Sequence, residues 1–314
     1  HHDNLRYWMN RGVDGFRFDA VNQLIENGKE AYQSQPENKV VMQGIQQVVT
    51  KSSPNHFMVC EEPTKPADAA QPDYCGSAFA FGFNDAVRET VSSGQVTGQL
   101  MRILKTYPLQ RMGLLLGNHD SYAGKRLIEA FNGDEARYRL AAATLLTLPG
   151  QPFIYYGEEI GMGTSQGNQD DWGLRAPMSW TAEGGFSSNP QVFRAPANNL
   201  AKYNAKDQMA QPDSLWHFYQ QLISLRKAHP ALRYGDVQVL SHQHALAFVR
   251  HAEKETVLVV LNYDTASTSL TLPTGKPNSH WRPLAGAHTA QQADQQGNLT
   301  LQPAGLSVTL YQLQ

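Results

Sequence analysis

Apolar and polar residues follow two different rhythms along this chain. As far as about residue 230, short apolar runs alternate with longer segments of helical periodicity. That alternation is typical of βαβ units around a parallel sheet. The predicted strands are Val13–Phe18, Phe57–Cys60, Ala78–Phe83, Met112–Leu116 and Phe153–Tyr156. The predicted helices are Lys39–Val49, Val96–Thr106, Ala136–Leu148 and Ser214–His229.

Beyond Tyr234 the pattern changes to short strands separated by Gly, Pro, Asn or Asp. These are Ala245–Arg250, Val257–Leu261, Leu270–Leu272, Leu299–Leu301 and Leu306–Leu310. Short strands between turn residues indicate a small antiparallel β-sandwich. We therefore predict an α/β domain over residues 1–232 and a β-sandwich domain over residues 233–314.

The number of predicted strands is too small for a closed eight-stranded α/β barrel. The chain also opens on His1–Asp3 directly before a helical pattern. We expect the first part of a barrel to come from another polypeptide, from residues outside this sequence, or from a swapped partner. The alternative is a complete, smaller α/β domain.

Charge and composition narrow the choice of partners. The formal net charge is −2 and 17% of the residues are charged, so we expect neither nucleic acid nor a membrane as partner. No apolar run approaches the roughly 20 residues that span a bilayer, and a neutral polar substrate fits better. Cys60 and Cys75 could form a disulfide, but a single pair leaves the compartment open, with a lean to an extracellular or periplasmic location.

Three carboxylates follow predicted strands. Asp19 closes the first strand, Glu61 follows the second, and Asp120 follows the fourth. In parallel α/β barrels these strand ends line the active site. A retaining glycoside hydrolase needs a nucleophile and an acid set roughly 5–5.5 Å apart, and Asp19 and Glu61 can fill these roles. Arg17 lies two residues before Asp19, so it should face the same side and hold Asp19 in its charged form.

The order and spacing of these motifs resemble the α-amylase family, glycoside hydrolase family 13, and in particular its α-glucosidase-like members. Gly15–Asp19, Glu61 and Asn118–Asp120 resemble its second, third and fourth characteristic regions. Leu145–Met162, Arg175–Trp180 and Ser214–Pro230 are also similar to that family. The resemblance covers nearly the whole chain and implies the C-terminal part of a (β/α)8 TIM barrel followed by an antiparallel β-sandwich domain.

The resemblance also implies a role for each site residue. Asp19 would be the nucleophile, Glu61 the general acid/base and Asp120 the stabiliser of the transition state. The substrate-binding residues would be Arg17, Asn118, His119 and Ala20. A small residue at Ala20, after the nucleophile, resembles the members that cleave α-1,4 bonds, because that side chain faces the next sugar.

The chain departs from the family pattern in three places. The family's first region, an Asp and a His on an earlier strand, has no counterpart in this sequence. Cys60 replaces a Gly or Ala before the acid, and Glu62 is a rival for the acid role. Asn22-Gln23 stand where many α-amylases have Lys-His, which argues against a typical endo-amylase site.

We therefore predict a retaining hydrolase that cleaves α-1,4-glucosidic bonds in malto-oligosaccharides or starch by double displacement. One alternative is a transglycosylase or isomerase of the same family, such as a trehalose or isomaltulose synthase. Another is an inactive carbohydrate-binding homologue. We expect no metal site and no cofactor, and we expect the long segment Gly163–Asn204 to be a functional loop.

Overall fold

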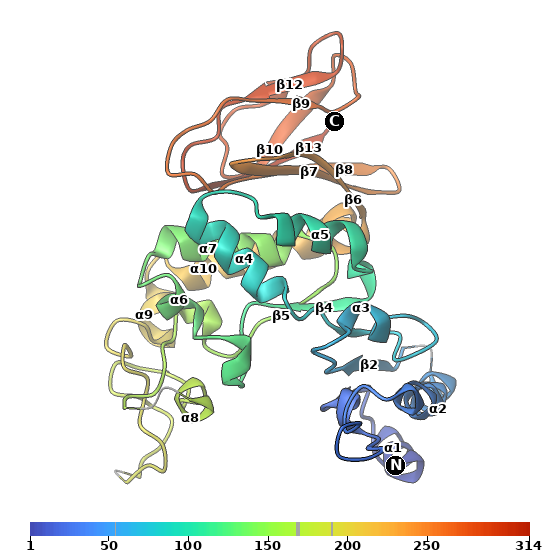
Figure 1. Cartoon of the computed structure of the whole chain (residues 1–314). Helices are drawn as coiled ribbons and strands as arrows, with labels where there is room; N and C mark the ends of the chain where they lie inside the picture. Colours follow the sequence, from blue (N-terminus) through green and yellow to red (C-terminus); the bar gives the residue numbers. More distant parts are fainter. Residues whose placement is uncertain (54, 168–169, 190) are drawn as a thin grey trace. The chain divides into compact units, whose positions relative to one another are not determined.

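The computed structural model describes residues 1–53, 55–167, 170–189 and 191–314 (Figure 1). The chain forms two compact units. Unit one comprises residues 1–83, 102–115 and 150–153, and unit two comprises residues 84–101, 116–149 and 154–314. The boundary at residues 232/233 stays a prediction. No helix in the described part of the chain has both the length and the apolar character needed to cross a membrane.

Unit one contains a parallel sheet in which the strands follow one another in sequence order. Its strands are β1 (Gly15–Phe18), β2 (Phe57–Cys60), β3 (Ala78–Phe79), β4 (Met112–Leu115) and β5 (Gln151–Phe153). In the register, Gly15 lies opposite Phe57 and Phe18 lies opposite Cys60. Because every pair is parallel, all the carboxyl ends lie at one edge of the sheet. This arrangement confirms the predicted partial α/β barrel.

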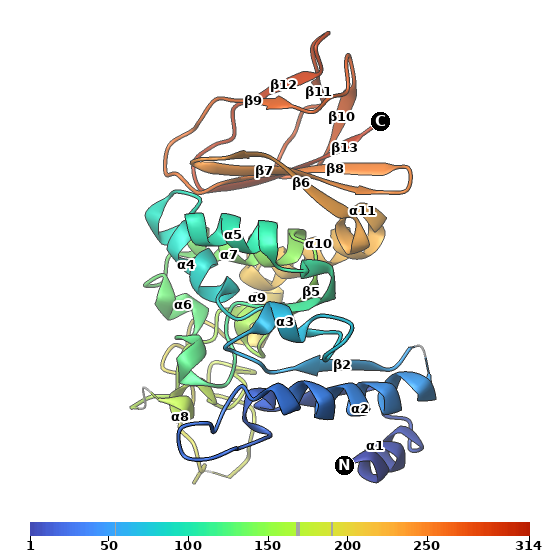
Figure 2. The same ribbon diagram turned by 45° about the vertical axis from the view of Figure 1, so that its right-hand side comes forward.

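Helices and aromatic side chains complete unit one. Its helices are α1 (His2–Met9), α2 (Pro36–Ser52) and α3 (Pro66–Ala69), with 3₁₀ turns at Val21–Gln23 and Leu109–Arg111. Helix α2 begins on Pro36, buries Met42, Ile45 and Val49 at helical spacing, and runs alongside β2 (Figure 2). One face of the sheet packs Val59, Phe79, Phe81 and Leu115 against Phe57 and Phe153.

A glycine permits this aromatic packing. A Cβ atom on Gly113 would lie 2.9 Å from the rings of both Phe79 and Phe153. Those two rings meet edge to face with centroids 4.8 Å apart. The absence of a side chain at Gly113 therefore lets the rings close over β4.

Two predicted strands were wrong in their extent. Strand β3 ends at Phe79, and Phe83 begins helix α4 (Phe83–Ser93), which the sequence pattern did not predict. Phenylalanines at every second position, ending at Phe83, imitate the alternation of a strand. Strand β5 is Gln151–Phe153 and not Phe153–Tyr156, because the backbone turns after it, with the Glu158 amide donating to the Tyr155 carbonyl.

Helix α7 (Glu135–Thr147) of unit two is buried along most of its length. Its cap is Asp134, whose carboxylate accepts from the amides of Ala136 and Arg137. It packs against α10 (Leu215–Ala228). The other helices are α6 (Leu127–Ala130), α8 (Asp171–Leu174), α9 (Ala205–Ala210) and α11 (Pro230–Tyr234), with 3₁₀ turns at Ser121–Ala123 and Glu158–Ile160. Helix α4 lies in this unit from residue 84 onward, and α5 (Gly98–Thr106) is divided between the two units after residue 101.

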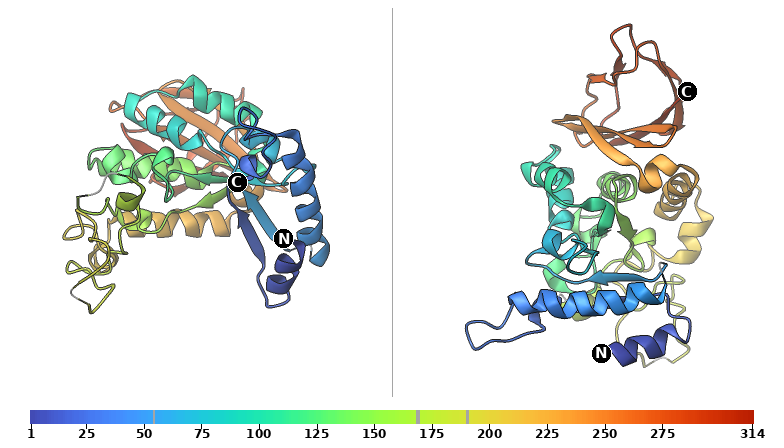
Figure 3. Two further views of the ribbon diagram at one scale, coloured as in Figure 1. Left: turned by 60° about the horizontal axis from the view of Figure 1, so that its bottom comes forward. Right: turned by 90° about the vertical axis from the view of Figure 1, so that its right-hand side faces the viewer.

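The C-terminal strands of unit two form two antiparallel sheets (Figure 3). One has the order β11-β10-β13-β8-β7-β6 and the other pairs β12 with β9. The strands are β6 (Asp236–His242), β7 (Ala245–Ala252), β8 (Glu255–Asn262), β9 (Leu270–Pro273), β10 (His280–Ala285), β11 (Gln291–Gln292), β12 (Asn298–Leu301) and β13 (Ser307–Leu313). Their shared core centres on the buried Trp281. The edge strands β6 and β11, and β10, were not predicted: β6 and β11 are rich in polar residues, and β10 contains Pro283, which argues against a strand.

Buried hydrogen bonds join this β domain to α7. The Tyr263 and Thr144 hydroxyls lie 2.8 Å apart. The fully buried Arg250 donates to the carbonyl oxygens of Thr147 and Gly235. Burial lowers the pKa of Arg250 to about 9, so these carbonyl contacts hold a costly charge in place.

Candidate active site

The ends of β1 and β2 bring together three of the predicted site residues. The Arg17 guanidinium donates through Nη1 to Asp19 Oδ1, and its Nη2 lies 2.7 Å from Glu61 Oε2. The Glu61 amide donates to the Phe18 carbonyl at 2.8 Å, so the backbone sets the two strand ends side by side. The Glu61 side chain is 7% exposed, whereas that of Asp19 is 75% exposed. One cation therefore holds a buried and an exposed carboxylate close to each other.

Ala20 adopts a left-handed backbone conformation directly after Asp19. Its φ is 43° and its ψ is 47°, which is uncommon outside glycine and worse for β-branched residues. The conformation lets the Ala20 amide donate to Glu61 Oε2 at 3.0 Å. The left-handed backbone conformation therefore disfavours a bulky or β-branched residue at Ala20, in addition to the predicted role of this side chain beside the next sugar.

Glu62 has different partners from Glu61. It is 2% exposed, and its Oε1 accepts from the amides of Thr64 at 2.9 Å and Lys65 at 3.1 Å. The Thr64 hydroxyl also donates to it. Its carboxylate therefore stabilises the turn that leads into α3.

A disulfide lies next to the proposed acid. Cys60, the last residue of β2, is bonded to Cys75, with their Cα atoms 6.3 Å apart. Both residues are buried, and the Cys60 amide donates to the Ser77 carbonyl at 3.1 Å. The question that the sequence left open is thus answered in favour of a bridge, which ties the residue before Glu61 to the chain entering β3.

Unit two holds a second group of predicted site residues, beyond β4. The Asp120 amide donates to Asn118 Oδ1 at 2.8 Å, and His119 Nε2 lies 3.3 Å from Asp120 Oδ2. Arg175 Nη2 lies 2.9 Å from Asp120 Oδ1, and Arg175 Nε donates to the His119 carbonyl at 2.8 Å. Asp120 is mostly buried, with 18% of its side chain exposed. Its carboxylate is therefore oriented by side chains on both oxygens.

Arg175 is the contact that sequence reasoning missed. It follows α8 and also reaches Asp171 Oδ2 at 3.2 Å, while the other oxygen of Asp171 accepts from the Ser121 amide at 2.6 Å. The available signal was Arg175–Trp180, a stretch similar to the family but without an assigned role. The predicted functional loop Gly163–Asn204 thus contributes directly to the surroundings of Asp120; its residues 168–169 and 190 lie outside the described residues.

Unit two also contains a buried carboxylate that the predicted chemistry does not use. Burial raises the pKa of Glu158 to about 7, against a lowering by the Tyr219 hydroxyl, which donates to Oε1 at 2.8 Å. The Tyr138 hydroxyl donates to the Glu158 carbonyl at 2.6 Å. Nearby, Arg126 stacks on Tyr155, with 4.2 Å between its guanidinium carbon and the ring centre. These contacts hold the segment of Tyr155 and Glu158, which follows β5, against the side chains of Arg126, Tyr138 and Tyr219.

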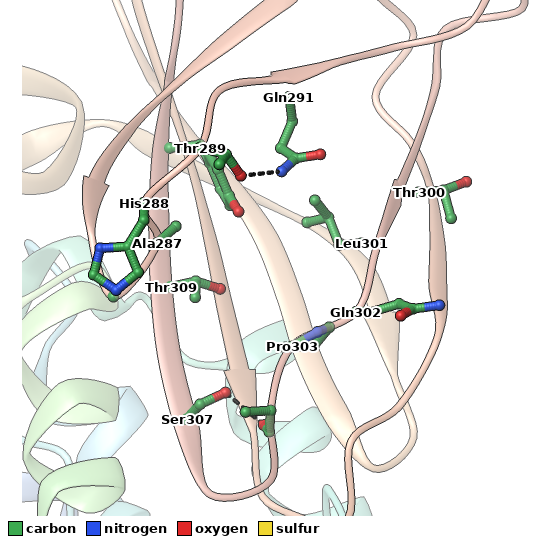
Figure 4. A pocket seen from close by; sticks show the side chains of 13 residues that line it. Ala287, His288, Thr289, Gln291, Thr300, Leu301, Gln302, Pro303, Ser307 and Thr309 are labelled. Atoms are coloured by element: carbon green, nitrogen blue, oxygen red, sulfur yellow. Dashed lines mark hydrogen bonds between the residues drawn. The ribbon is translucent and has the colours of Figure 1, made fainter.

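A cavity of about 570 Å³ in the β domain has a different chemical character (Figure 4). Its described lining residues offer hydroxyl, amide and imidazole groups but no carboxylate, and they include His288, Thr289, Gln291, Thr300 and Thr309. Gln291 Nε2 donates to the Thr289 hydroxyl at 3.1 Å. Acid–base cleavage of a glycoside needs two carboxyl groups, so this cavity is not the candidate for that chemistry.

Fold and site together define a class: a partial α/β barrel with acids at its carboxyl edge, followed by an antiparallel sheet domain. The family model "Alpha amylase, catalytic domain" matches residues 1–235, and "Maltogenic Amylase, C-terminal domain" matches residues 237–308. The chain belongs to the α-amylase family, glycoside hydrolase family 13.

Individual relatives agree with this family. The trehalose synthase/amylase TreS of Mycobacterium tuberculosis is 30% identical over 83% of this chain and 52% of its own length. A cyclomaltodextrinase of a Bacillus species is 26% identical over 89% of this chain and 44% of its own length. The crystal structure of an α-amylase from H. orenii matches the fold with a TM-score of 0.76 at 22% identity, over 100% of this chain and 63% of that chain. This chain therefore spans about half the length of the curated relatives that it matches.

Proposed function

We propose that this chain carries the nucleophile, the acid/base and the transition-state stabiliser of a retaining enzyme that cleaves α-1,4-glucosidic bonds in malto-oligosaccharides or starch. The observation that carries the proposal is the bridge made by Arg17 between Asp19 and Glu61. Such a bridge is compatible with the separation of roughly 5–5.5 Å that a double displacement requires.

The proposed reaction has two steps. An Asp19 oxygen attacks the anomeric carbon while Glu61 gives its proton to the leaving glycosidic oxygen, so that a covalent glucosyl–enzyme forms and the aglycone departs. Glu61 then takes a proton from water, and the resulting hydroxide oxygen displaces Asp19 from the anomeric carbon. Asp120, held by Arg175, accepts hydrogen bonds from the sugar hydroxyls as the ring distorts. Glu61 is preferred to Glu62 because the Glu62 carboxylate is taken up by the 62–65 turn.

The same site supports a second candidate, an isomerase or transglycosylase. The observation that favours it is the 30% identity to a protein named trehalose synthase/amylase. Both reactions share the glucosyl–enzyme and differ in whether water or a sugar hydroxyl accepts the glucosyl group. Incubation with maltose and analysis of the products separates them: glucose alone supports the hydrolase, and trehalose supports the isomerase. The third possibility, an inactive homologue, is disfavoured by the three carboxylates and their hydrogen-bonded partners.

We also propose that further barrel strands are supplied from outside these residues. In the described part of the chain, β1 and β5 each pair with one neighbouring strand of the parallel sheet. Unpaired edges of a parallel sheet expose hydrogen-bonding groups that proteins normally cover. Activity is accordingly tested on the full-length protein in which this chain occurs.

Replacement of Asp19 by Asn tests the proposed function. The change is nearly isosteric but removes the attacking charge, so turnover of 4-nitrophenyl α-glucoside should fall by several powers of ten. Asp14→Asn, at the exposed position before β1, is the matched control and should leave turnover unchanged. If Asp19→Asn keeps more than about a tenth of the wild-type rate, Asp19 is not the nucleophile.

A further inference from the structure

Two exposed aromatic rings, those of Trp172 and Phe193, lie in the described part of the segment that also carries Arg175, the partner of Asp120. Phe193 is 90% exposed and Trp172 is 50% exposed. Their ring centroids lie 6.0 Å apart with an interplanar angle of 63°. A large apolar side chain exposed to this degree loses hydration free energy, so a pair of them on one surface suggests that something covers them.

Specific contacts hold this pair in place. The Arg194 guanidinium lies 4.5 Å from the centre of the Trp172 ring and 5.9 Å from that of Phe193. Arg194 Nη1 also donates to the Arg175 carbonyl at 2.8 Å, and Arg175 in turn binds Asp120. An unbroken chain of contacts therefore runs from the predicted catalytic carboxylate to the exposed rings.

The backbone around the rings is also fixed by pairing. Ser165 and Ala197 form an antiparallel bridge, and the Ser165 amide donates to the Gly173 carbonyl at 2.8 Å. This pairing brings the α8 region and residues 193–194 together although they are far apart in sequence. These contacts hold the backbone at Ser165, Gly173 and Ala197 together near the rings, which lowers the entropic cost of binding.

We propose that Trp172 and Phe193, aligned by Arg194, form a stacking platform for a glucosyl unit of an α-glucan beyond the one that is cleaved. This inference rests on the proposed function and adds a determinant of chain-length preference. The apolar C–H face of a pyranose packs on an aromatic ring, while its hydroxyls need polar partners at the rim. Gln191, which is exposed and lies two residues before Phe193 in the sequence, carries such an amide group.

A protein partner fits this surface less well. A stable protein interface buries about 800 Å² on each side and has an apolar centre. Here two rings stand in a segment rich in Gly, Ser, Asn and Gln, which is small and polar by comparison. A neutral sugar ring matches both the area and the polarity.

The test compares substrates of different length in the full-length protein. Trp172→Ala and Phe193→Ala should lower kcat/KM for maltoheptaose about tenfold, as expected for losing one stacking contact, and leave 4-nitrophenyl α-glucoside unchanged. Arg194→Ala should act in the same direction, and Trp172→Phe should retain most of the maltoheptaose activity. Tyr234→Ala, at a similarly exposed aromatic on α11, is the control and should change neither substrate.

Binding separates this inference from the proposed function. Maltoheptaose titrations of the Asp19→Asn protein, followed by tryptophan fluorescence, should give a Kd that Phe193→Ala raises about tenfold. The platform is wrong if Phe193→Ala leaves the maltoheptaose Kd unchanged, or if the ring variants lower kcat/KM equally for maltoheptaose and 4-nitrophenyl α-glucoside. Platform-dependent binding by a protein inactive on every α-glucoside would overturn only the proposed function. If the wild type self-associates in light scattering and Phe193→Ala prevents it without changing maltoheptaose binding, the rings are a contact between copies and the platform is wrong.

Discussion

Glu158→Gln is expected to remove a pH-dependent loss of stability. Glu158 is buried in unit two, and burial raises its pKa from the usual 4.5 to about 7. This difference corresponds to a preference of about 3 kcal/mol for the protonated form in the native state. The native protein therefore holds a proton that the unfolded chain releases above pH 4.5. The stabilisation is complete below that pH and is lost as the pH rises to about 7.

Between pH 5 and pH 8 this group alone should lower the free energy of unfolding by about 2.5 kcal/mol. Gln cannot ionise, but its side-chain oxygen still accepts from the Tyr219 hydroxyl. The variant should therefore be close to wild type at pH 5 and more stable than wild type at pH 8.

Urea unfolding at pH 5, 6, 7 and 8 measures this difference, with the free energy of unfolding extrapolated to water at each pH. The exposed Glu183→Gln serves as the matched control and should follow the wild-type profile. Parallel profiles for wild type and Glu158→Gln would show that Glu158 is already ionised at pH 5 in the native state, and the burial argument would then be wrong.

Glu61→Gln should lose far more activity on a glucoside with a poor leaving group than on one with a good leaving group, whereas Glu62→Gln should affect both alike; the opposite pattern would move the acid role to Glu62. Arg175→Ala leaves Asp120 without its guanidinium partner, so kcat for maltose should fall by about 10²-fold, and an unchanged kcat would remove Arg175 from the site. Arg250→Met removes the guanidinium that donates to the buried Thr147 and Gly235 carbonyl groups and should destabilise the protein by about 3 kcal/mol in urea unfolding, while a neutral effect would show that these contacts contribute little.

Much of the fold could be predicted from sequence because its signals are local. The apolar runs of β2 and β4 and the spacing of α10 come from a few consecutive residues, and their limits agree with the structure to within a residue or two. The predicted strand Ala78–Phe83 was wrong, because its alternating phenylalanines continue into the first residue of helix α4. Alternation within a short segment is not enough to exclude a helix start, because Phe83, Val87 and Val91 of α4 are buried at helical spacing.

The sequence by itself placed Asp19 and Glu61 at the ends of neighbouring parallel strands, and topology then makes their side chains meet. Only the tertiary structure decided that Cys60 bonds Cys75, that Glu62 turns to the 62–65 turn, and that Arg175 reaches Asp120. Periodicity along the chain determines which face a residue occupies, since it depends only on local backbone geometry. The partner across a long sequence separation depends on how whole segments pack, and no local pattern encodes it.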